Sequence, residues 1–315
     1  MTGVSAGKVI LAGEHAVVFG VPALAVGIEQ GASASSRANF AARSSLTIPD
    51  WQLSVATDEM GDKHNDFACA FGNLLDEARR HQRVPEVDVT AHASLPPGRG
   101  LGCSAALGVA IARSLVRDDE AAVAACAMAW ERVFHGNPSG VDAAVCMRGG
   151  CVRFVKGEAP ETVTLGAPLL LAVGFSGASS STRVMVEHVA TLREQSRARV
   201  DDAFTRIRSI VNRAADATRC GRQSDLGKLL SENQTVLATL ALSTPAIDRM
   251  CSVAEVAGAL GSKLTGAGGG GCVIALVDGP EGLARVLDAW AQAGFLGFAT
   301  EVLNLPSQVS LQVGE

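Results

Sequence analysis

Short apolar runs alternate with stretches of helical periodicity through the first half of the chain. Residues 7–20 predict two short strands around a turn, and residues 22–28 begin a third. Further strands are predicted at residues 46–48, 87–91, 150–154 and 169–173. Apolar residues that recur every three or four positions predict helices at residues 66–80, 105–116 and 120–134.

The second half is largely helical in its periodicity, over residues 181–260. After it, runs at residues 272–277 and 300–305 predict strands that enclose a helix at residues 280–293, a split β-α-β pattern. A polar stretch rich in Pro, Gly and Glu at residues 156–161 is the best candidate boundary. We therefore predict an α+β fold with a larger mixed domain, residues 1–165, and a smaller one, residues 166–315.

Length, composition and charge fit a soluble enzyme. The chain has 315 residues, of which 48% are hydrophobic, and this is enough for two domains with sizeable cores. Its 27 basic and 32 acidic residues give a net charge of −5 without a basic stripe. Nucleic acid is therefore a poor candidate partner.

The eight cysteines include no Cys-x-x-Cys pair, and several, such as Cys126 and Cys272, lie within apolar runs. We expect small core residues in a reducing compartment, with disulfides or a zinc site as the alternative. The first ten residues lack the apolar core of a signal peptide, and no apolar run reaches the roughly 18 residues of a membrane span. These features predict a cytoplasmic protein that does not enter a membrane.

A glycine-rich segment at residues 96–106 carries the first candidate chemistry. Gly98, Gly100 and Gly102 can take positive φ and let the backbone approach an anion. Ser104 lies at the cap or first turn of the next predicted helix, where unpaired N–H groups and the helix dipole favour phosphate. An ordinary N-cap after a glycine-rich turn is the alternative. The segment is not a Walker A loop, because no Gly-Lys-Ser/Thr follows.

A second candidate site surrounds the end of the next predicted helix. Glu131 falls in its last turn, where the helix dipole disfavours a carboxylate by up to roughly 1 kcal/mol, so a cation is expected there. Arg132 or a lysine can supply it, or Glu131 and Ser104 can share a magnesium ion that bridges nucleotide phosphates. Residues 136–140 then form a shaped turn that presents Asp142, either as a plain turn residue or as a catalytic one.

A second glycine-rich segment, Lys-Leu-Thr-Gly-Ala-Gly-Gly-Gly-Gly-Cys, occupies residues 263–272. It matches the dinucleotide fingerprint and the protein-kinase glycine loop by pattern. Both interpretations fail, because the glycines precede a strand and the sequence has no His-Arg-Asp or Asp-Phe-Gly motif. We expect a loop that closes over substrate or phosphate, with a hairpin-like turn as the alternative.

Three elements together resemble the GHMP kinase superfamily. They are Gly-Lys-Val-Ile-Leu-x-Gly-Glu-His-Ala-Val-Val near the N-terminus, Pro-x-x-x-Gly-Leu-Gly-x-Ser-Ala-Ala, and the late Lys-x-Thr-Gly-Ala-Gly-Gly-Gly-Gly-Cys. Within the superfamily, residues 13–18 and 135–142 are similar to mevalonate kinases. The resemblance runs from Gly7 to Cys272 and is weak over residues 32–84. It implies a two-domain GHMP kinase fold, with an ATP-binding N-terminal domain like ribosomal protein S5 domain 2 and a ferredoxin-like C-terminal domain whose tail packs back on the first.

The resemblance also implies an activity and a set of site residues. The activity is ATP-dependent and Mg²⁺-dependent phosphorylation of the C5 hydroxyl of mevalonate, in isoprenoid biosynthesis, by a protein that forms a homodimer. Asp142 matches the catalytic aspartate and Lys8 the lysine beside it, while Ser104 and Glu131 match the magnesium ligands. The residues implied to hold the ATP phosphates are Pro97, Gly98, Arg99, Gly100, Leu101, Gly102, Cys103, Ser104, Ala105 and Ala106. Those implied to bind mevalonate are Glu14, His15, Thr182, Gly268 and Gly269.

Two positions depart from the family pattern. Cys103 replaces the first serine of a usual Ser-Ser pair, which leaves the second, metal-ligating serine in place. Ser179 and Ser180 stand where a basic pair often precedes the threonine, a change that bears on substrate affinity. The alternatives are another small-molecule kinase of the superfamily, such as a phosphomevalonate or homoserine kinase, and a non-catalytic sensor of ATP and a metabolite.

Overall fold

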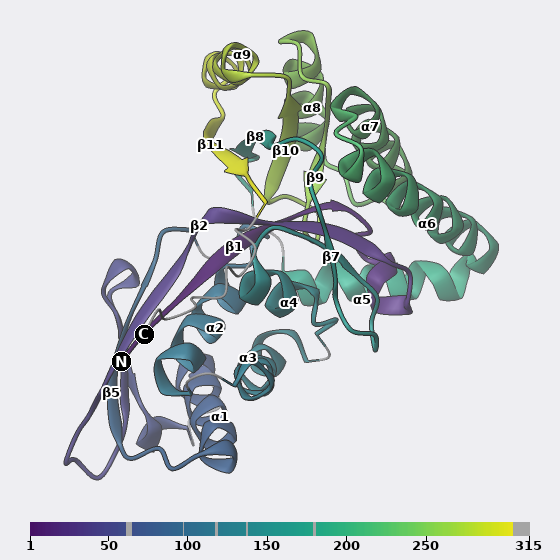
Figure 1. Ribbon diagram of the computed structural model, residues 1–315. Coiled ribbons are helices and arrows are strands. Elements are labelled where there is room, and N and C mark those ends of the chain that lie inside the picture. Colours follow the sequence, from purple (N-terminus) through teal and green to yellow (C-terminus); the bar gives the residue numbers. More distant parts are fainter. Residues whose placement is uncertain (61–64, 97, 117–118, 137, 179–180, 305–315) are drawn as a thin grey trace, which may run out of the picture.

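The computed structural model describes residues 1–60, 65–96, 98–116, 119–136, 138–178 and 181–304. Two β-sheets organise the chain, one built mainly from the first half and one from the second. In Figure 1 the first half, in purple and blue, occupies the lower part of the molecule, and the sheet of the second half lies above it.

The larger sheet has the strand order β4-β3-β5-β2-β6-β7, with β1 paired to β2. Its long strand β2 pairs with β1 on one edge, and with β5 and then β6 on the other, so it joins the whole sheet. Only the pair β3 and β5 is parallel among the described pairs. The strands are β1 (Thr2–Ala12), β2 (Ala23–Ala38), β3 (Ser45–Ile48), β4 (Leu53–Ala56), β5 (Val87–Ala93), β6 (Cys151–Phe154) and β7 (Glu161–Val163).

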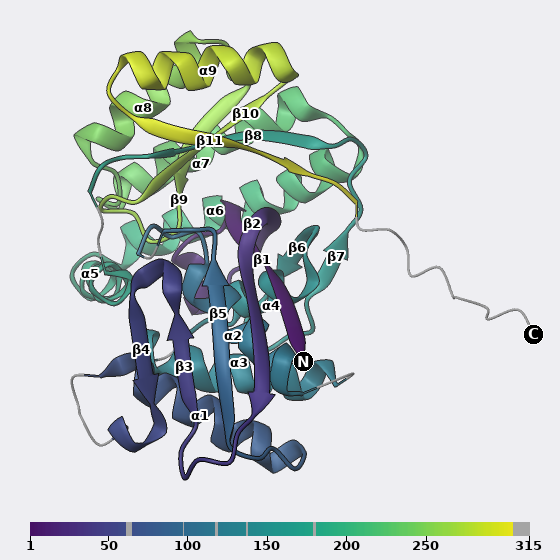
Figure 2. The same cartoon turned by 90° about the vertical axis from the view of Figure 1, so that its left-hand side faces the viewer.

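Helices cover one face of this sheet, and they lie behind the strands in Figure 2. They are α1 (Asp66–His81), α2 (Cys103–Leu115), α3 (Glu120–His135) and α4 (Val141–Arg148). The helix α2 is buried on nearly all sides because it lies between the sheet and α3. Its small residues permit this close packing, since a Cβ at Gly108 would come within 2.7 Å of the Trp130 ring. That contact fixes α2 against α3.

The second sheet has the order β11-β8-β10-β9 and is antiparallel throughout its described pairs. Its strands are β8 (Leu169–Phe175), β9 (Gly261–Thr265), β10 (Cys272–Val277) and β11 (Leu296–Val302). The helices of this half are α5 (Thr182–Gln195), α6 (Arg197–Arg219), α7 (Gln223–Thr239), α8 (Pro245–Val256) and α9 (Pro280–Gln292). In Figure 2, α8 and α9 lie over the sheet at the top of the molecule.

The predicted α+β composition is confirmed, and four predictions of elements are corrected. Residues 16–19 form a 3₁₀ helix (Ala16–Phe19) and not a second strand, and the Val18 N–H bonds back to the carbonyl of His15, three residues earlier, at 3.0 Å. The helix α4 begins in the segment predicted as a loop, and the strand β9 includes the first three residues of the second glycine-rich segment. The last strand begins at Leu296 and ends at Val302, while the predicted end at residue 305 lies outside the described residues.

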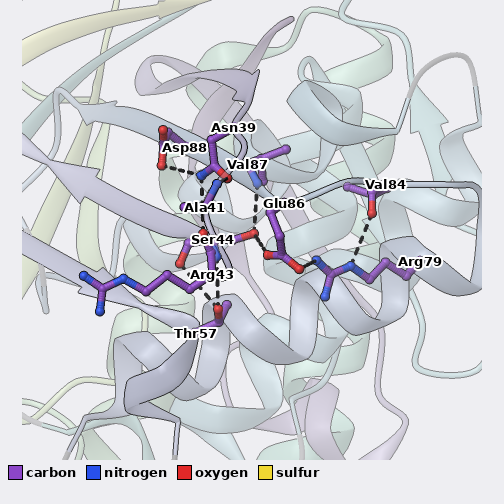
Figure 3. Close-up of polar contacts among 10 residues, drawn as sticks. All are labelled: Asn39, Ala41, Arg43, Ser44, Thr57, Arg79, Val84, Glu86, Val87 and Asp88. Atoms are coloured by element: carbon purple, nitrogen blue, oxygen red, sulfur yellow. Dashed lines mark hydrogen bonds and ion pairs between the residues drawn. The ribbon is translucent and has the colours of Figure 1, made fainter.

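A polar cluster braces the end of the larger sheet farthest from the second half (Figure 3). The buried Ser44 hydroxyl accepts the Val87 N–H at 3.0 Å and donates to the Glu86 carboxylate. Arg79, in the last turn of α1, donates to the same carboxylate at 2.7 Å. The cluster ties the β2–β3 connection and α1 to the start of β5, so we assign it a structural role.

The cysteines largely follow the prediction of small core residues. Six of the eight are buried, while Cys69 is half-buried and Cys220 is exposed. Within the described residues, none of the helices combines the length and the apolar character needed to cross a membrane.

Candidate active site

The glycine-rich segment before α2 forms a turn of left-handed backbone. Gly98, Gly100 and Gly102 have φ of 70°, 81° and 73°, values that side chains disfavour. A Cβ at Gly102 would lie 2.6 Å from Cγ of Lys8, so only glycine lets the lysine pass beneath the turn. The turn therefore exposes backbone N–H groups at the start of a helix, an arrangement suited to an anion.

Three helices point N-termini without side-chain caps at this region. They are α2, α4 and α5, whose N-cap residues Gly102, Gly140 and Ser181 accept no capping bond and line the cavities described below. Among the helices that begin outside the cavity walls, α1, α3 and α8 have side-chain caps, whereas α6, α7 and α9 do not. The free first-turn N–H groups and the dipoles of α2, α4 and α5 favour negative charge at their common focus.

Two adjoining cavities open here. The first, of about 240 Å³, is lined by the glycine turn, the start of α2, the end of α3 and the loop between β9 and β10. The second, of about 360 Å³, lies between the 3₁₀ helix, the segment before α4 and the first turns of α5. The residues common to both walls are Gly100, Glu131, His135, Asp142, Thr182 and Ala267. A ligand in one cavity can therefore meet a ligand in the other at these residues.

Lys8 and Asp142 meet at this junction. The Lys8 ammonium lies 3.1 Å from Oδ1 of Asp142 and donates to the Gly100 carbonyl, also at 3.1 Å. The Lys8 side chain is 3% exposed, whereas Asp142 is 31% exposed and faces both cavities. Asp142 belongs to the first turn of α4, where the helix dipole stabilises a carboxylate, and not to the loop that the sequence predicts.

Ser104 and Glu131 form a second polar pair on the wall of the first cavity. The Ser104 hydroxyl donates to Oε1 of Glu131 at 2.6 Å, and the Trp130 indole N–H bonds to the Ser104 carbonyl at 3.0 Å. Burial raises the pKa of Glu131 to about 7, because the ionised carboxylate would have too little contact with water to be well solvated. Among the described residues the His135 ring lies 3.4 Å from this carboxyl group. Neither Arg132 nor a lysine forms an ion pair with Glu131 among the described residues, contrary to one of our alternatives.

Replacing Glu131 by glutamine should change the pH dependence of stability in buffer without divalent cations. Because the folded protein holds the Glu131 proton up to about pH 7, while the unfolded chain releases it near pH 4.5, the wild type loses stability between these values. Urea unfolding should therefore give E131Q a gain over the wild type at pH 8 that is absent at pH 4.5. An equal difference at both pH values would contradict the assigned burial effect.

Glu14 and His15 lie on the wall of the second cavity. The Glu14 carboxylate, predicted to bind substrate, contacts the Lys263 ammonium and accepts a hydrogen bond from the Asn233 amide at 3.1 Å. His15, at φ 59°, donates from Nε2 to the Ala267 carbonyl at 2.8 Å. Burial lowers the pKa of His15 to about 4, so the ring is neutral at pH 7 and Nδ1 is an acceptor. This Nδ1 is buried and has no partner among the described residues.

Lys263 and Thr265, on β9, join the two halves of the protein at β1. The Ile10 N–H donates to the Thr265 hydroxyl at 2.8 Å, and the buried Lys263 ammonium contacts the Ile10 carbonyl at 3.3 Å. Burial lowers the pKa of Lys263, an effect that the Glu14 charge opposes. The sequence analysis singled out the glycines that follow Lys263 and Thr265. It did not predict that these two side chains connect the two halves of the protein.

The second glycine-rich segment forms the hairpin loop between β9 and β10, which is the alternative given for it. Gly268, Gly270 and Gly271 also line the first cavity, and closure over substrate or phosphate stays a prediction. Gly269 lines neither cavity, and its N–H donates to the Leu242 carbonyl at 2.8 Å. Thr182 lines both.

The remaining predicted residues divide between cavity wall and core. Arg99, Cys103 and Ala105 line the first cavity. Leu101 and Ala106 are buried behind it, and the Leu101 carbonyl accepts the Lys8 N–H at 2.9 Å. Pro97, Ser179 and Ser180 lie outside the described residues.

Comparison with known proteins agrees with this architecture. Residues 65–150 match the family model for the GHMP kinases N terminal domain, and residues 213–295 match that for GHMP kinases C terminal. A mevalonate kinase of Aeropyrum pernix is 32% identical over 95% of this chain and 96% of its own length. A mevalonate kinase of Mus musculus is 30% identical over 86% and 84%. The crystal structure of the L. major mevalonate kinase in complex with R-mevalonate superposes with a TM-score of 0.82, at 22% identity, over 98% of this chain and 97% of that one.

Proposed function

Because the chain belongs to the GHMP kinase family, we propose that it transfers the γ-phosphoryl group of ATP to the C5 hydroxyl of mevalonate and forms 5-phosphomevalonate. The observation that carries the proposal is the Lys8–Asp142 pair at the junction of two adjoining cavities. One cavity suits a nucleotide phosphate chain and the other a small acceptor. The names of the relatives support mevalonate as that acceptor.

In this proposal the first cavity holds the ATP phosphates. The turn at Gly98, Gly100 and Gly102 and the N-terminus of α2 supply backbone donors without a competing cap. The α5 N-terminus faces the same cavity through Ser181 and Thr182. Phosphoryl transfer has a loose transition state rich in negative charge, so fixed donors of this kind supply much of the rate acceleration.

In the second cavity the acceptor hydroxyl meets Asp142. The hydroxyl gives its proton to the Asp142 carboxylate as its oxygen forms the new bond to the γ-phosphorus, and the bond from that phosphorus to the leaving oxygen of ADP breaks. Lys8, 3.1 Å from Oδ1 of Asp142, keeps the carboxylate oriented and adds positive charge beside the transferring group. The free acceptor Nδ1 of His15 suits a hydroxyl of the substrate.

Ser104 and Glu131 fit a magnesium ion. Their oxygens lie 2.6 Å apart on the wall of the first cavity, and the buried Glu131 carboxylate lacks a lysine or arginine partner among the described residues. No group of three or more His, Cys, Asp and Glu able to hold a metal occurs in the described chain, and Mg²⁺ is commonly held by one or two protein groups with water and phosphates. When bound, the ion neutralises phosphate charge.

Replacing Ser104 by alanine should raise the Mg²⁺ concentration needed for half-maximal activity severalfold, because one oxygen ligand is lost. Titration of activity with MgCl₂ at saturating ATP measures this change. S209A, on the exposed surface of α6, is the matched control and should titrate like the wild type. An unchanged titration in S104A would leave Ser104 only its structural bonds to Glu131 and Trp130.

A phosphotransfer panel tests the choice of acceptor. Mevalonate should give the highest kcat/KM among mevalonate, phosphomevalonate, homoserine and galactose. A higher value for phosphomevalonate or homoserine would make the chain another kinase of this family. Binding of ATP and mevalonate without turnover would make it a sensor. The cytoplasmic location and the homodimer stay predictions.

A further inference from the structure

The second cavity carries more charge than the transfer chemistry uses. Its lining includes the acidic residues Glu14, Glu131, Asp142 and Glu187 and the basic or imidazole residues Lys8, His15, His135 and Arg183. The proposed acceptor also carries a charge, because mevalonate is a carboxylate at neutral pH. We therefore expect one of the positively charged residues that line this cavity to bind that carboxylate.

Most of these groups already have partners or are neutral. Lys8 is paired with Asp142, and Glu14 with Lys263. Burial lowers the pKa of His15 to about 4, so its ring is neutral at pH 7, and the His135 ring lies 3.4 Å from Glu131. The remaining charged residues of this wall are Arg183 and Glu187, both on α5.

Arg183 is available for a ligand. It lies in the first turn of α5 beside Thr182, which lines both cavities, and it makes no hydrogen bond or ion pair with the other described residues. Glu187 lies one turn further along the same helix, but Arg183 and Glu187 form no ion pair. An arginine four residues before a glutamate is the weaker orientation for such a pair on a helix. The uncapped N-terminus of α5 adds positive potential at the same place.

We propose that Arg183 binds the carboxylate of the acceptor and selects for an anionic substrate, an inference that rests on the proposed function. A guanidinium can bind a carboxylate through two parallel hydrogen bonds, which fixes the orientation of the ligand as well as its affinity. With the carboxylate held on α5 and the terminal hydroxyl at Asp142, the acceptor spans the cavity. The apolar side chains of Val17, Val18 and Val186 also line this cavity.

The test compares R183Q with the wild type on two acceptors. One is mevalonate, and the other is 3-methylpentane-1,3,5-triol, in which a hydroxymethyl group replaces the carboxylate. R183Q should raise KM for mevalonate about 10- to 100-fold, the loss expected for a charged hydrogen bond, with little change in kcat. KM for the triol should be nearly the same in R183Q and wild type. R206Q, an exposed arginine change on α6, is matched in charge and should behave like the wild type on both.

Calorimetric binding of mevalonate, which does not depend on turnover, separates this inference from the proposed function. Loss of affinity in R183Q but not in R206Q supports Arg183 even if transfer is slow. An unchanged KM and affinity in R183Q, or an equal loss on mevalonate and triol, overturns the role of Arg183 and leaves the proposed function standing. Absence of mevalonate binding to the wild type contradicts both.

Discussion

Replacing Asp142 by asparagine should lower kcat by roughly 10²- to 10⁴-fold, the range expected when a positioned acid-base group is lost. ATP affinity should change little, because the phosphate-binding turn and the N-terminus of α2 stay in place. Asparagine preserves the shape of the side chain, but its neutral amide accepts a weaker hydrogen bond from the acceptor hydroxyl and no longer pairs with Lys8 at 3.1 Å.

The measurement is steady-state turnover together with ATP binding by calorimetry. D202N, on the exposed surface of α6, makes the same chemical change away from both cavities and should retain wild-type turnover. Turnover in D142N within about threefold of D202N, well below the loss expected for an acid-base group, would contradict the assigned role of Asp142. Loss of ATP binding in D142N would instead indicate damage to the first cavity.

Replacing Lys263 by methionine should lower the free energy of unfolding by about 3–5 kcal/mol, the usual cost of leaving a buried charge without its partner. Both side chains of the Glu14–Lys263 pair are 0% exposed, and Lys263 also bonds to the Ile10 carbonyl on β1. The pair connects the two halves of the chain, so its loss weakens the joint beneath the active site.

Urea unfolding of three variants isolates this effect. K228M removes an exposed lysine of α7 and should leave stability nearly unchanged. E14Q/K263M removes both charges and should recover much of the stability lost in K263M, because the remaining amide can still accept the Asn233 bond. A double variant less stable than K263M would show that the charges are not coupled.

The sequence was most informative where the signal is local. The helix over residues 120–134 was predictable because its apolar periodicity is long, Asp119 caps its start and Gly136 its end. The 3₁₀ helix at residues 16–19 and the short helix α4 were not, since each begins after residues with positive φ that contradict a simple strand or loop pattern. Short elements carry too few residues for periodicity to identify them.

The residues of the candidate site also divide into those predictable from a local motif and those that depend on a long-range contact. Lys8, Ser104, Glu131 and Asp142 could be proposed from their motifs, and the fold brings them to adjoining cavities. The pairing of Glu14 with Lys263 could not be predicted, because Lys263 lies 249 positions away and only the packing of β9 against β1 brings it close. Contacts between residues so far apart in the chain produce no periodic pattern in the sequence.

The central claim is tested most directly by ADP release from the purified protein with MgATP, in the presence and absence of mevalonate. The account predicts mevalonate-dependent ADP release, matched one for one by 5-phosphomevalonate. Equal ADP release with and without mevalonate, at concentrations that saturate ATP binding, would contradict it.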